Sequence, residues 1–207
     1  MLGLSQSELK VFKRLSTPIK IQDFLDSLPI NWEKKGDTYM SPRRVLSEKK
    51  AHCLEGALFA AAALWVHGED PLVVDLKAVG DIDHVIAVYK RNGYWGAISK
   101  TNHSTLRFRD PVHKTIRELA LSYFHEYFND TTGKKALRSF SNPVDLRKIG
   151  TQWITRDDDL HDVALLIDSA RHISIFPKKN LKFIRKADGM ERKAGKLIEW
   201  KKANKHT

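Results

Sequence analysis

The chain has 207 residues, of which 42% are hydrophobic and 29% are charged, so it is long enough to bury the core of one medium-sized domain. No apolar run reaches the roughly 18 residues of a membrane-spanning helix, and the N-terminal residues lack the apolar stretch of a secretory signal. The one cysteine, Cys53, excludes an internal disulfide and fits a reducing compartment, so we expect a cytoplasmic protein.

The net charge of +11 is concentrated near the C-terminus. Residues 178–207 hold eleven Lys and Arg residues against three acidic residues, so this segment carries +8 and leaves +3 for the remainder. The sequence therefore predicts a single domain over residues 1–177 followed by a basic C-terminal segment over 178–207. Such a segment suits nucleic acid or an acidic partner, and it equally suits a solvated helix face.

The first third of the chain is expected to form helices. Apolar residues recur at helical spacing, and Ser7 is positioned to cap the first helix. These early helices are expected over residues 7–15, 19–28 and 43–49, with a loop over 29–42.

The clearest predicted helix covers residues 53–67 and begins at Cys53. Its apolar stripe is wide, and small residues occupy most of the remaining positions, so the helix can pack closely on all sides. Gly68 follows as a natural end signal. The pattern indicates a central, buried helix.

Antiparallel strands are expected after this helix. Apolar runs predict strands over residues 72–76, 83–90 and 94–99, and the Asn-Gly pair at 92–93 favours a tight hairpin between the last two. Helices followed by antiparallel strands, and then by more helices, predict an α+β fold rather than a doubly wound sheet.

The remainder of the chain is expected to be mostly helical. Helical spacing of apolar residues predicts helices over 113–128 and 159–171, and a short strand is expected over 173–176. The acidic run at residues 157–159 is typical of a helix N-terminus, where carboxylates match the helix dipole.

Cys53 lies in the first turn of the predicted buried helix. Free backbone N–H groups and the positive end of the helix dipole both favour a thiolate there, and the thiolate is the nucleophilic form of cysteine. The same amides can stabilise an oxyanion when an acyl group is attacked. The alternative is a small buried core residue, which is the common role of a lone cysteine.

Residues 41–102 contain several short motifs whose order and spacing carry a family resemblance. In chain order, these motifs are Ser41-Pro42-Arg43-Arg44-Val45-Leu46, Ala51-His52-Cys53-Leu54-Glu55-Gly56-Ala57, Gly68-Glu69-Asp70-Pro71, Leu72-Val73-Val74-Asp75-Leu76, Asp83-His84-Val85-Ile86-Ala87-Val88 and Trp95-Gly96-Ala97-Ile98. Together they resemble the transglutaminase-like (papain-like cysteine) superfamily. In that superfamily a cysteine begins the core helix, a histidine begins the next-but-one strand, and an aspartate lies on the strand after it. The resemblance implies a buried helix packed on an antiparallel sheet, with Cys53 as nucleophile and His84 as its base.

The position of the family aspartate carries no acid in this chain. Ser99 matches that position, and a two-residue turn at 92–93 would place it on the same strand face as His84. A three-residue loop would instead put Asn102 opposite His84, and papain-like enzymes use asparagine to orient the histidine. Both residues stay candidates for the third site residue. A serine can orient the imidazole but adds no charge to stabilise imidazolium.

Ionisable neighbours of these residues allow other interpretations. Asp81, Asp83 and His84 suggest a metal site, but Asp83 and His84 should point to opposite faces of a strand and would make a poor cage. We therefore expect neither a metal nor a cofactor. His52 is interpreted as a residue of the helix entry rather than as a second base.

These features predict a thiol-dependent enzyme that transfers or hydrolyses an acyl group of an amide or ester, with a protein or peptide as a suitable substrate. Cys53 would attack the carbonyl and His84 would take and return the proton. The alternative is a catalytically inactive relative that serves as a binding module, with the basic segment binding nucleic acid or an acidic partner. The missing acid motivates this alternative.

Overall fold

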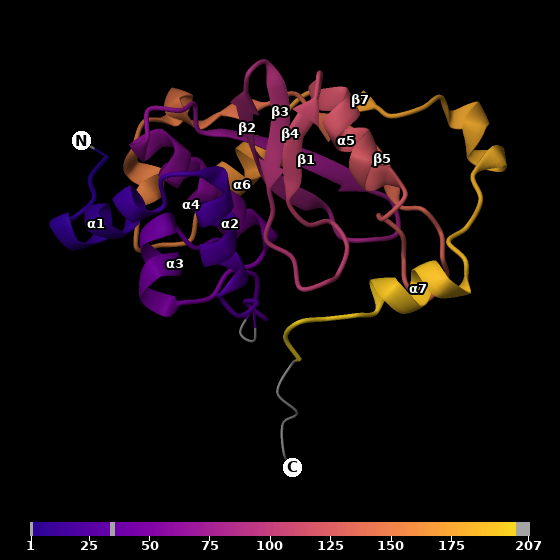
Figure 1. The fold of residues 1–207 in the computed structure, drawn as a ribbon, viewed down its shortest axis with the longest axis horizontal. Helices are drawn as coiled ribbons and strands as arrows, with labels where there is room; N and C mark the ends of the chain where they lie inside the picture. The colour runs from indigo at the N-terminus through magenta and orange to yellow at the C-terminus, as the bar shows by residue number, and fades with distance from the viewer. Residues whose placement is uncertain (1, 34–35, 202–207) are drawn as a thin grey trace, which may run out of the picture.

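The computed structural model describes residues 2–33 and 36–201. It has the expected α+β architecture, with an antiparallel sheet flanked by helices (Figure 1). Helices α1 to α4 gather at one end of the molecule, whereas α5 and α7 lie toward the other.

The N-terminal helices follow the predicted order, with small shifts at their ends. Their bounds are α1 (Gln6–Arg14), α2 (Pro18–Asp26), α3 (Pro42–Glu48) and α4 (Cys53–Val66). The predicted cap Ser7 is wrong, because Ser5 caps α1. The Ser5 hydroxyl accepts from the Glu8 amide, and the Glu8 carboxylate accepts from the Ser5 amide, which completes a capping box.

One sheet contains the seven strands of the described residues, and every pairing in it is antiparallel. The strand order is β4-β3-β2-β1-β5-β7, and β6 pairs with β1 beside this path. The strands are β1 (Leu72–Ala78), β2 (His84–Arg91), β3 (Tyr94–Ile98), β4 (Arg109–His113), β5 (Leu137–Ser141), β6 (Val144–Asp145) and β7 (His172–Ser174). The sequence predicted β1, β2, β3 and β7 but not the other three, which are short and lack a clean alternation of apolar residues.

The β2–β3 hairpin has a two-residue turn, as predicted. Arg91 pairs with Tyr94, and the register continues to Ala87 opposite Ile98. Asn92 and Gly93 both have positive φ, 49° and 86°, which is the conformation that favours Asn-Gly in such turns.

The C-terminal half contains less helix than predicted. Its helices are α5 (Ile116–Phe124), α6 (His161–Asp168) and α7 (Gly189–Gly195), with short 3₁₀ turns over Leu146–Ile149, Gln152–Ile154 and Lys178–Phe183. The expected acidic cap of the helix at 159–171 is wrong, because Leu160 is the N-cap of α6. Asp159 instead accepts from the Tyr39 amide and pairs with Arg44.

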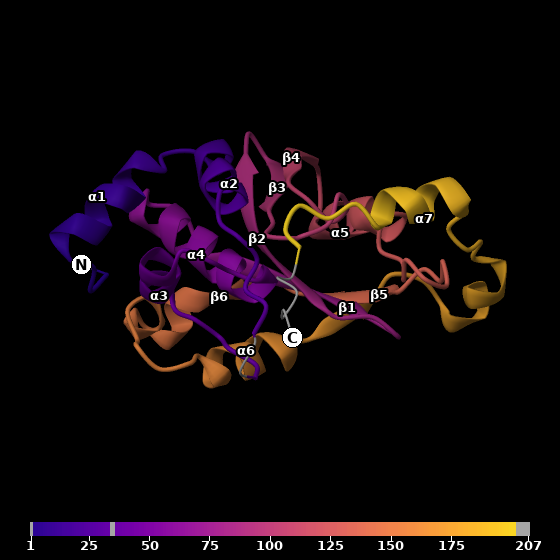
Figure 2. The same ribbon diagram turned by 90° about the horizontal axis from the view of Figure 1, so that it is seen from below.

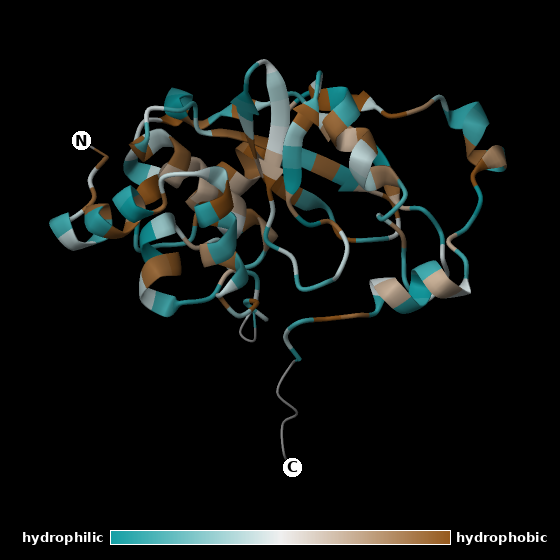
Figure 3. Ribbon diagram, in the orientation of Figure 1, coloured by the Kyte–Doolittle hydropathy of each residue, from teal (hydrophilic) through white to brown (hydrophobic). Residues whose placement is uncertain are grey.

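Two apolar cores lie on opposite faces of the sheet. On one face, α4 packs against β2 beneath α1, α2 and α3, and its residues 54–64 are all buried. On the other face, α5 covers β3 and β5. Figure 2 shows the N-terminal helices and α5 flanking the strands, and Figure 3 shows polar residues on much of the outer helix surface. The predicted buried helix beginning at Cys53 is thus confirmed.

A buried lysine fixes how closely α4 approaches the end of β3. Lys100 is fully buried, and its ammonium group donates to the carbonyl oxygens of Leu25 (2.8 Å), in the last turn of α2, and of Leu28, just after this helix. Its stem crosses α4 at Gly56, where a Cβ atom would lie only 2.4 Å from the Lys100 Cβ. Because Gly56 has no Cβ atom, the Lys100 side chain can pass directly against α4.

Candidate active site

Cys53 is the first residue of α4 and lines a cleft of about 1140 Å³. The cleft also receives His84 from the start of β2 and His52 from the residue before the helix. Both imidazoles act on the Cys53 thiol and lower its pKa. The structure therefore places Cys53 and His84, predicted as partners, in one cleft at the N-terminus of a helix.

Hydrogen bonds around His84 define its tautomer. The His84 Nε2 atom lies 2.7 Å from the Ser99 Oγ atom, and the Ser99 hydroxyl donates to the Leu106 carbonyl oxygen at 2.5 Å. A hydroxyl has only one hydrogen, so Ser99 must accept from His84, which places the ring hydrogen on Nε2. The Nδ1 atom is then unprotonated and is the nitrogen available to the Cys53 sulfur.

Asn102, the other candidate for the third site residue, lies elsewhere. Its side chain donates to the Trp200 carbonyl oxygen (2.9 Å) and accepts from the Trp200 amide (2.8 Å). The two-residue turn sets the register that brings Ser99 to His84. Asn102 consequently anchors the C-terminal segment instead of orienting the imidazole.

The surroundings of Cys53 favour its ionised form. Burial alone would raise the pKa of the thiol, but its interactions with the His52 and His84 imidazoles outweigh burial and hold the pKa well below its usual range. The start of α4 adds the helix dipole in the same direction. These effects favour the thiolate form of Cys53 relative to a free cysteine.

His52 has a larger part in the site than the sequence indicated. It is the N-cap of α4, as expected for a residue of the helix entry, because its Nδ1 atom accepts from the Leu54 amide at 3.2 Å. Its imidazole also lowers the pKa of the Cys53 thiol. The spacing of His52 and Glu55 matches a capping box, and this signal could have identified the pair.

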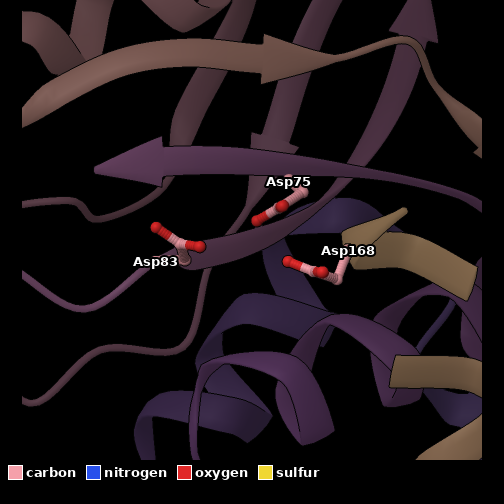
Figure 4. Close-up of side chains that lie close together, drawn as sticks. All are labelled: Asp75, Asp83 and Asp168. Atoms are coloured by element: carbon pink, nitrogen blue, oxygen red, sulfur yellow. The ribbon is translucent and has the colours of Figure 1, made fainter. Parts of the chain in front are cut away.

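A cluster of three carboxylates occupies another part of the same cleft. Oxygen atoms of Asp75, Asp83 and Asp168 all lie within 4.8 Å of one another (Figure 4). Lys77 pairs with Asp168 at 2.8 Å, and the His172 Nε2 atom lies 3.0 Å from Asp75. These two partners offset part of the negative charge of the cluster.

The position of Asp83 agrees with the strand alternation used in the prediction. Asp83 joins Asp75, which pairs across the sheet with Val85 on the face covered by α4. Ile86 packs in the opposite core, and His84 shares its side of β2 by alternation. Asp83 and His84 thus point away from each other.

The Asp75 carboxyl should make the stability of the protein depend on pH. Burial, helped by the charge of Asp83, raises its pKa to about 6. An unfolded aspartate titrates near pH 4, so Asp75 stabilises the fold below about pH 4, and this contribution is lost as the pH rises through about 6. Relative to wild type, Asp75→Asn should gain up to about 2–3 kcal/mol of unfolding free energy between these pH values.

Urea denaturation at a series of pH values would measure this difference. Asp168→Asn is the matched control, because it removes the same charge from the same cluster at a side chain that is 60% exposed. The difference in unfolding free energy between Asp168→Asn and wild type should change less with pH. A constant difference between Asp75→Asn and wild type across this pH range would contradict the prediction.

The C-terminal segment forms one edge of the cleft. The Glu199 amide donates to the Asn102 carbonyl oxygen and the Ser104 amide donates to that of Leu197, so residues 197–200 run beside 102–104. Gly195 and Ile198 line the cleft. The basic segment is therefore not separate from the candidate site. Within the part of it that the structure describes, most Lys and Arg side chains are exposed, and nucleic-acid binding by this segment stays a prediction.

Among the helices of the described residues, none combines the length and apolarity needed to cross a membrane. No protein-family model matches the chain, and no curated protein sequence matches it. The resemblance of residues 41–102 to the transglutaminase-like superfamily thus stays a prediction.

Proposed function

We propose that this protein is a thiol-dependent enzyme that transfers or hydrolyses an acyl group of an amide or ester, and that it has a transglutaminase-like core. The observation that carries this proposal is that the Cys53 thiol, at the N-terminus of α4, shares one cleft with the His84 imidazole, which lowers the thiol pKa and whose Nε2 atom is held by Ser99. Nucleophile, base and orienting group are the three parts that cysteine-dependent acyl transfer requires.

The arrangement of elements supports the resemblance to the superfamily. Cys53 begins a buried helix, His84 begins the next-but-one element, and Ser99 directly follows β3. These are the positions that the superfamily pattern assigns to nucleophile, base and acid. Ser99 supplies orientation without charge, which is the departure from that pattern.

The reaction follows from these roles. The Cys53 thiolate attacks the carbonyl carbon, a C–S bond forms, and the carbonyl oxygen becomes an oxyanion that the start of α4 stabilises. The oxyanion collapses, the bond to the leaving nitrogen or oxygen breaks, and an imidazolium proton passes to the leaving group. Water or an amine, deprotonated by His84, then attacks the thioester and frees the thiol. Water gives hydrolysis, an amine gives transfer, and the same residues serve both.

Alkylation of Cys53 by iodoacetamide tests the activation of the thiol. Near pH 6, wild type should react about tenfold faster than a free model thiol, because a larger thiolate fraction outweighs the lower nucleophilicity of a low-pKa thiolate. Since Cys53 is the only cysteine, the Cys53→Ala variant should take up no label and serves as the control. A wild-type rate at or below that of the model thiol would contradict the proposed function.

A further inference from the structure

In the part of the chain that the structure describes, the two imidazoles that lower the pKa of the Cys53 thiol share its cleft, and His84 is hydrogen-bonded to a hydroxyl rather than to an acid. Ser99, the partner of His84, is neutral, so it cannot balance the charge of an imidazolium on that side. The other imidazole, His52, is placed differently, because carboxylates lie beside it. This difference raises the question of which imidazole holds the proton that leaves the thiol.

His52 is held in a fixed orientation. Its Nε2 atom donates to the Thr38 carbonyl oxygen at 2.7 Å, and its Nδ1 atom lies at the start of α4, where it accepts from the Leu54 amide. A carbonyl oxygen can only accept, so the ring hydrogen of neutral His52 is on Nε2 and the lone pair is on Nδ1. Neutral His52, like neutral His84, thus carries its lone pair on Nδ1.

Carboxylates surround the far side of the His52 ring. The Nε2 atom lies 3.4 Å from a Glu55 oxygen and 3.6 Å from a Glu33 oxygen. Tyr39 contacts the ring edge-on, with centroids 6.3 Å apart. Together with Cys53, these are the titratable groups that face His52 within residues 2–33 and 36–201, so an imidazolium there has two carboxylates and a thiolate as neighbours.

Several hydrogen bonds hold the buried side chain of Glu55 in place. Its side chain is completely buried, and its oxygens accept from the Asn31 amide group, the Thr38 hydroxyl and the Met40 and His52 backbone amides. These hydrogen-bond donors offset the free-energy cost of burying a negatively charged carboxylate.

We propose, on the basis of the proposed function, that His52 is the positioning residue that holds the proton of the Cys53 thiol in the resting protein, and that Glu55 supplies the charge that Ser99 does not. His84 then stays neutral and serves as the base for the incoming water or amine.

The proton balance of this scheme closes. The thiol proton moves from Sγ to His52 Nδ1, which leaves a thiolate and an imidazolium. The Leu54 amide loses its cap acceptor in the exchange, and the negative sulfur at the helix start gains from the dipole. Burial lowers the pKa of His52, but Cys53, Glu55 and the Thr38 carbonyl together raise it to about 9. After the thiolate attacks, the sulfur no longer carries the charge, and the His52 proton passes to the leaving group. In deacylation His84 takes a proton from the water or amine, the thioester C–S bond breaks, and this proton returns through the freed sulfur to His52, which restores the resting pair.

The titration of the Cys53 thiolate tests this proposal. The rate of iodoacetamide alkylation is measured against pH for wild type, His52→Asn, Glu55→Gln and His84→Asn. Asparagine is a strong N-cap residue, so His52→Asn keeps the start of α4 while removing the ionisable ring. The His52→Asn midpoint should lie at least about one pH unit above that of wild type, a tenfold loss of thiolate below both midpoints. Glu55→Gln should shift it in the same direction by less.

His67→Asn is the matched control. It removes an imidazole from the other end of the same helix, where the His67 Nε2 atom bonds to the Phe12 carbonyl oxygen, and it should leave the midpoint unchanged. Circular dichroism melting confirms that each variant is folded. A depressed wild-type midpoint that only His84→Asn raises would overturn this proposal and leave the proposed function standing. A wild-type midpoint near that of a free thiol would overturn both.

Discussion

Replacement of His84 by glutamine should lower the steady-state turnover of p-nitrophenyl acetate by about 10²–10⁴-fold, the usual contribution of a positioned general base. His84 Nδ1 carries the lone pair because its Nε2 hydrogen is committed to Ser99. Glutamine retains hydrogen-bonding capacity but cannot take a proton from water. Hydrolysis of the acetyl-thioester on Cys53 should therefore become the slow step.

The first turnover distinguishes the role of His52 from that of His84. p-Nitrophenolate is a good leaving group that needs no proton, so acylation depends mainly on the amount of thiolate. If His52 maintains the thiolate, His84→Gln should keep the initial burst of p-nitrophenol and lose the turnover that follows. Loss of the burst together with turnover would instead indicate that His84 carries the thiol proton as well.

Two further variants serve as comparisons for His84→Gln. Ser99→Ala removes the acceptor that fixes the His84 tautomer, so its turnover should fall, but by less than in His84→Gln, because the base itself remains. Cys53→Ala should lose burst and turnover together. Unchanged turnover in His84→Gln would mean that the contact with Cys53 has no part in the reaction.

The exchange of Gly56 for alanine should destabilise the protein by about 1–3 kcal/mol, the usual cost of overpacking a core. The new Cβ would lie 2.4 Å from the Lys100 Cβ, which is part of the buried stem and not a flexible end. Lys100 cannot withdraw easily, because its ammonium group is bonded to the carbonyls of Leu25 and Leu28. The free-energy cost of this clash should exceed the roughly 1 kcal/mol of stability that alanine gains over glycine in a helix.

Urea denaturation would measure the change through the transition midpoint at unchanged slope. Gly189→Ala is the matched control, because Gly189 is also helical and its Cβ would meet no atom within 4 Å. The control should be neutral or slightly stabilising. A Gly56→Ala protein as stable as wild type would show that Lys100 and α4 can separate without cost.

Most of the fold that positions the site could be predicted from local sequence signals. The helix at Cys53 followed from its run of apolar and small residues, and the β2–β3 hairpin followed from Asn92-Gly93. The short strands β4, β5 and β6 could not be found in this way, because they depend on pairing with distant parts of the chain. The acidic residues before α6 were misread for the same reason, since Asp159 pairs with Arg44 rather than capping the helix.

The sequence predicted Cys53 and His84 as partners, and both line one cleft, but the place of His52 beside them was not predicted. A local pattern can indicate that His52 caps a helix, whereas its effect on the thiol depends on the orientation of its ring. That orientation is set by Thr38, fourteen residues away. The choice between Ser99 and Asn102 required only the number of residues in one turn, which the sequence indicated without deciding.

The length of the hairpin turn at Asn92 and Gly93 therefore selects the group that meets His84. The turn lies at the far end of β2 from the cleft, yet one inserted residue there would move every later residue of β3 by one position relative to β2. The side chain facing the imidazole would change although no residue of the site had been altered. In related chains, the equivalent of Ser99 is accordingly identified by counting from the turn, and a change in the length of this loop is a route by which evolution could exchange the orienting group.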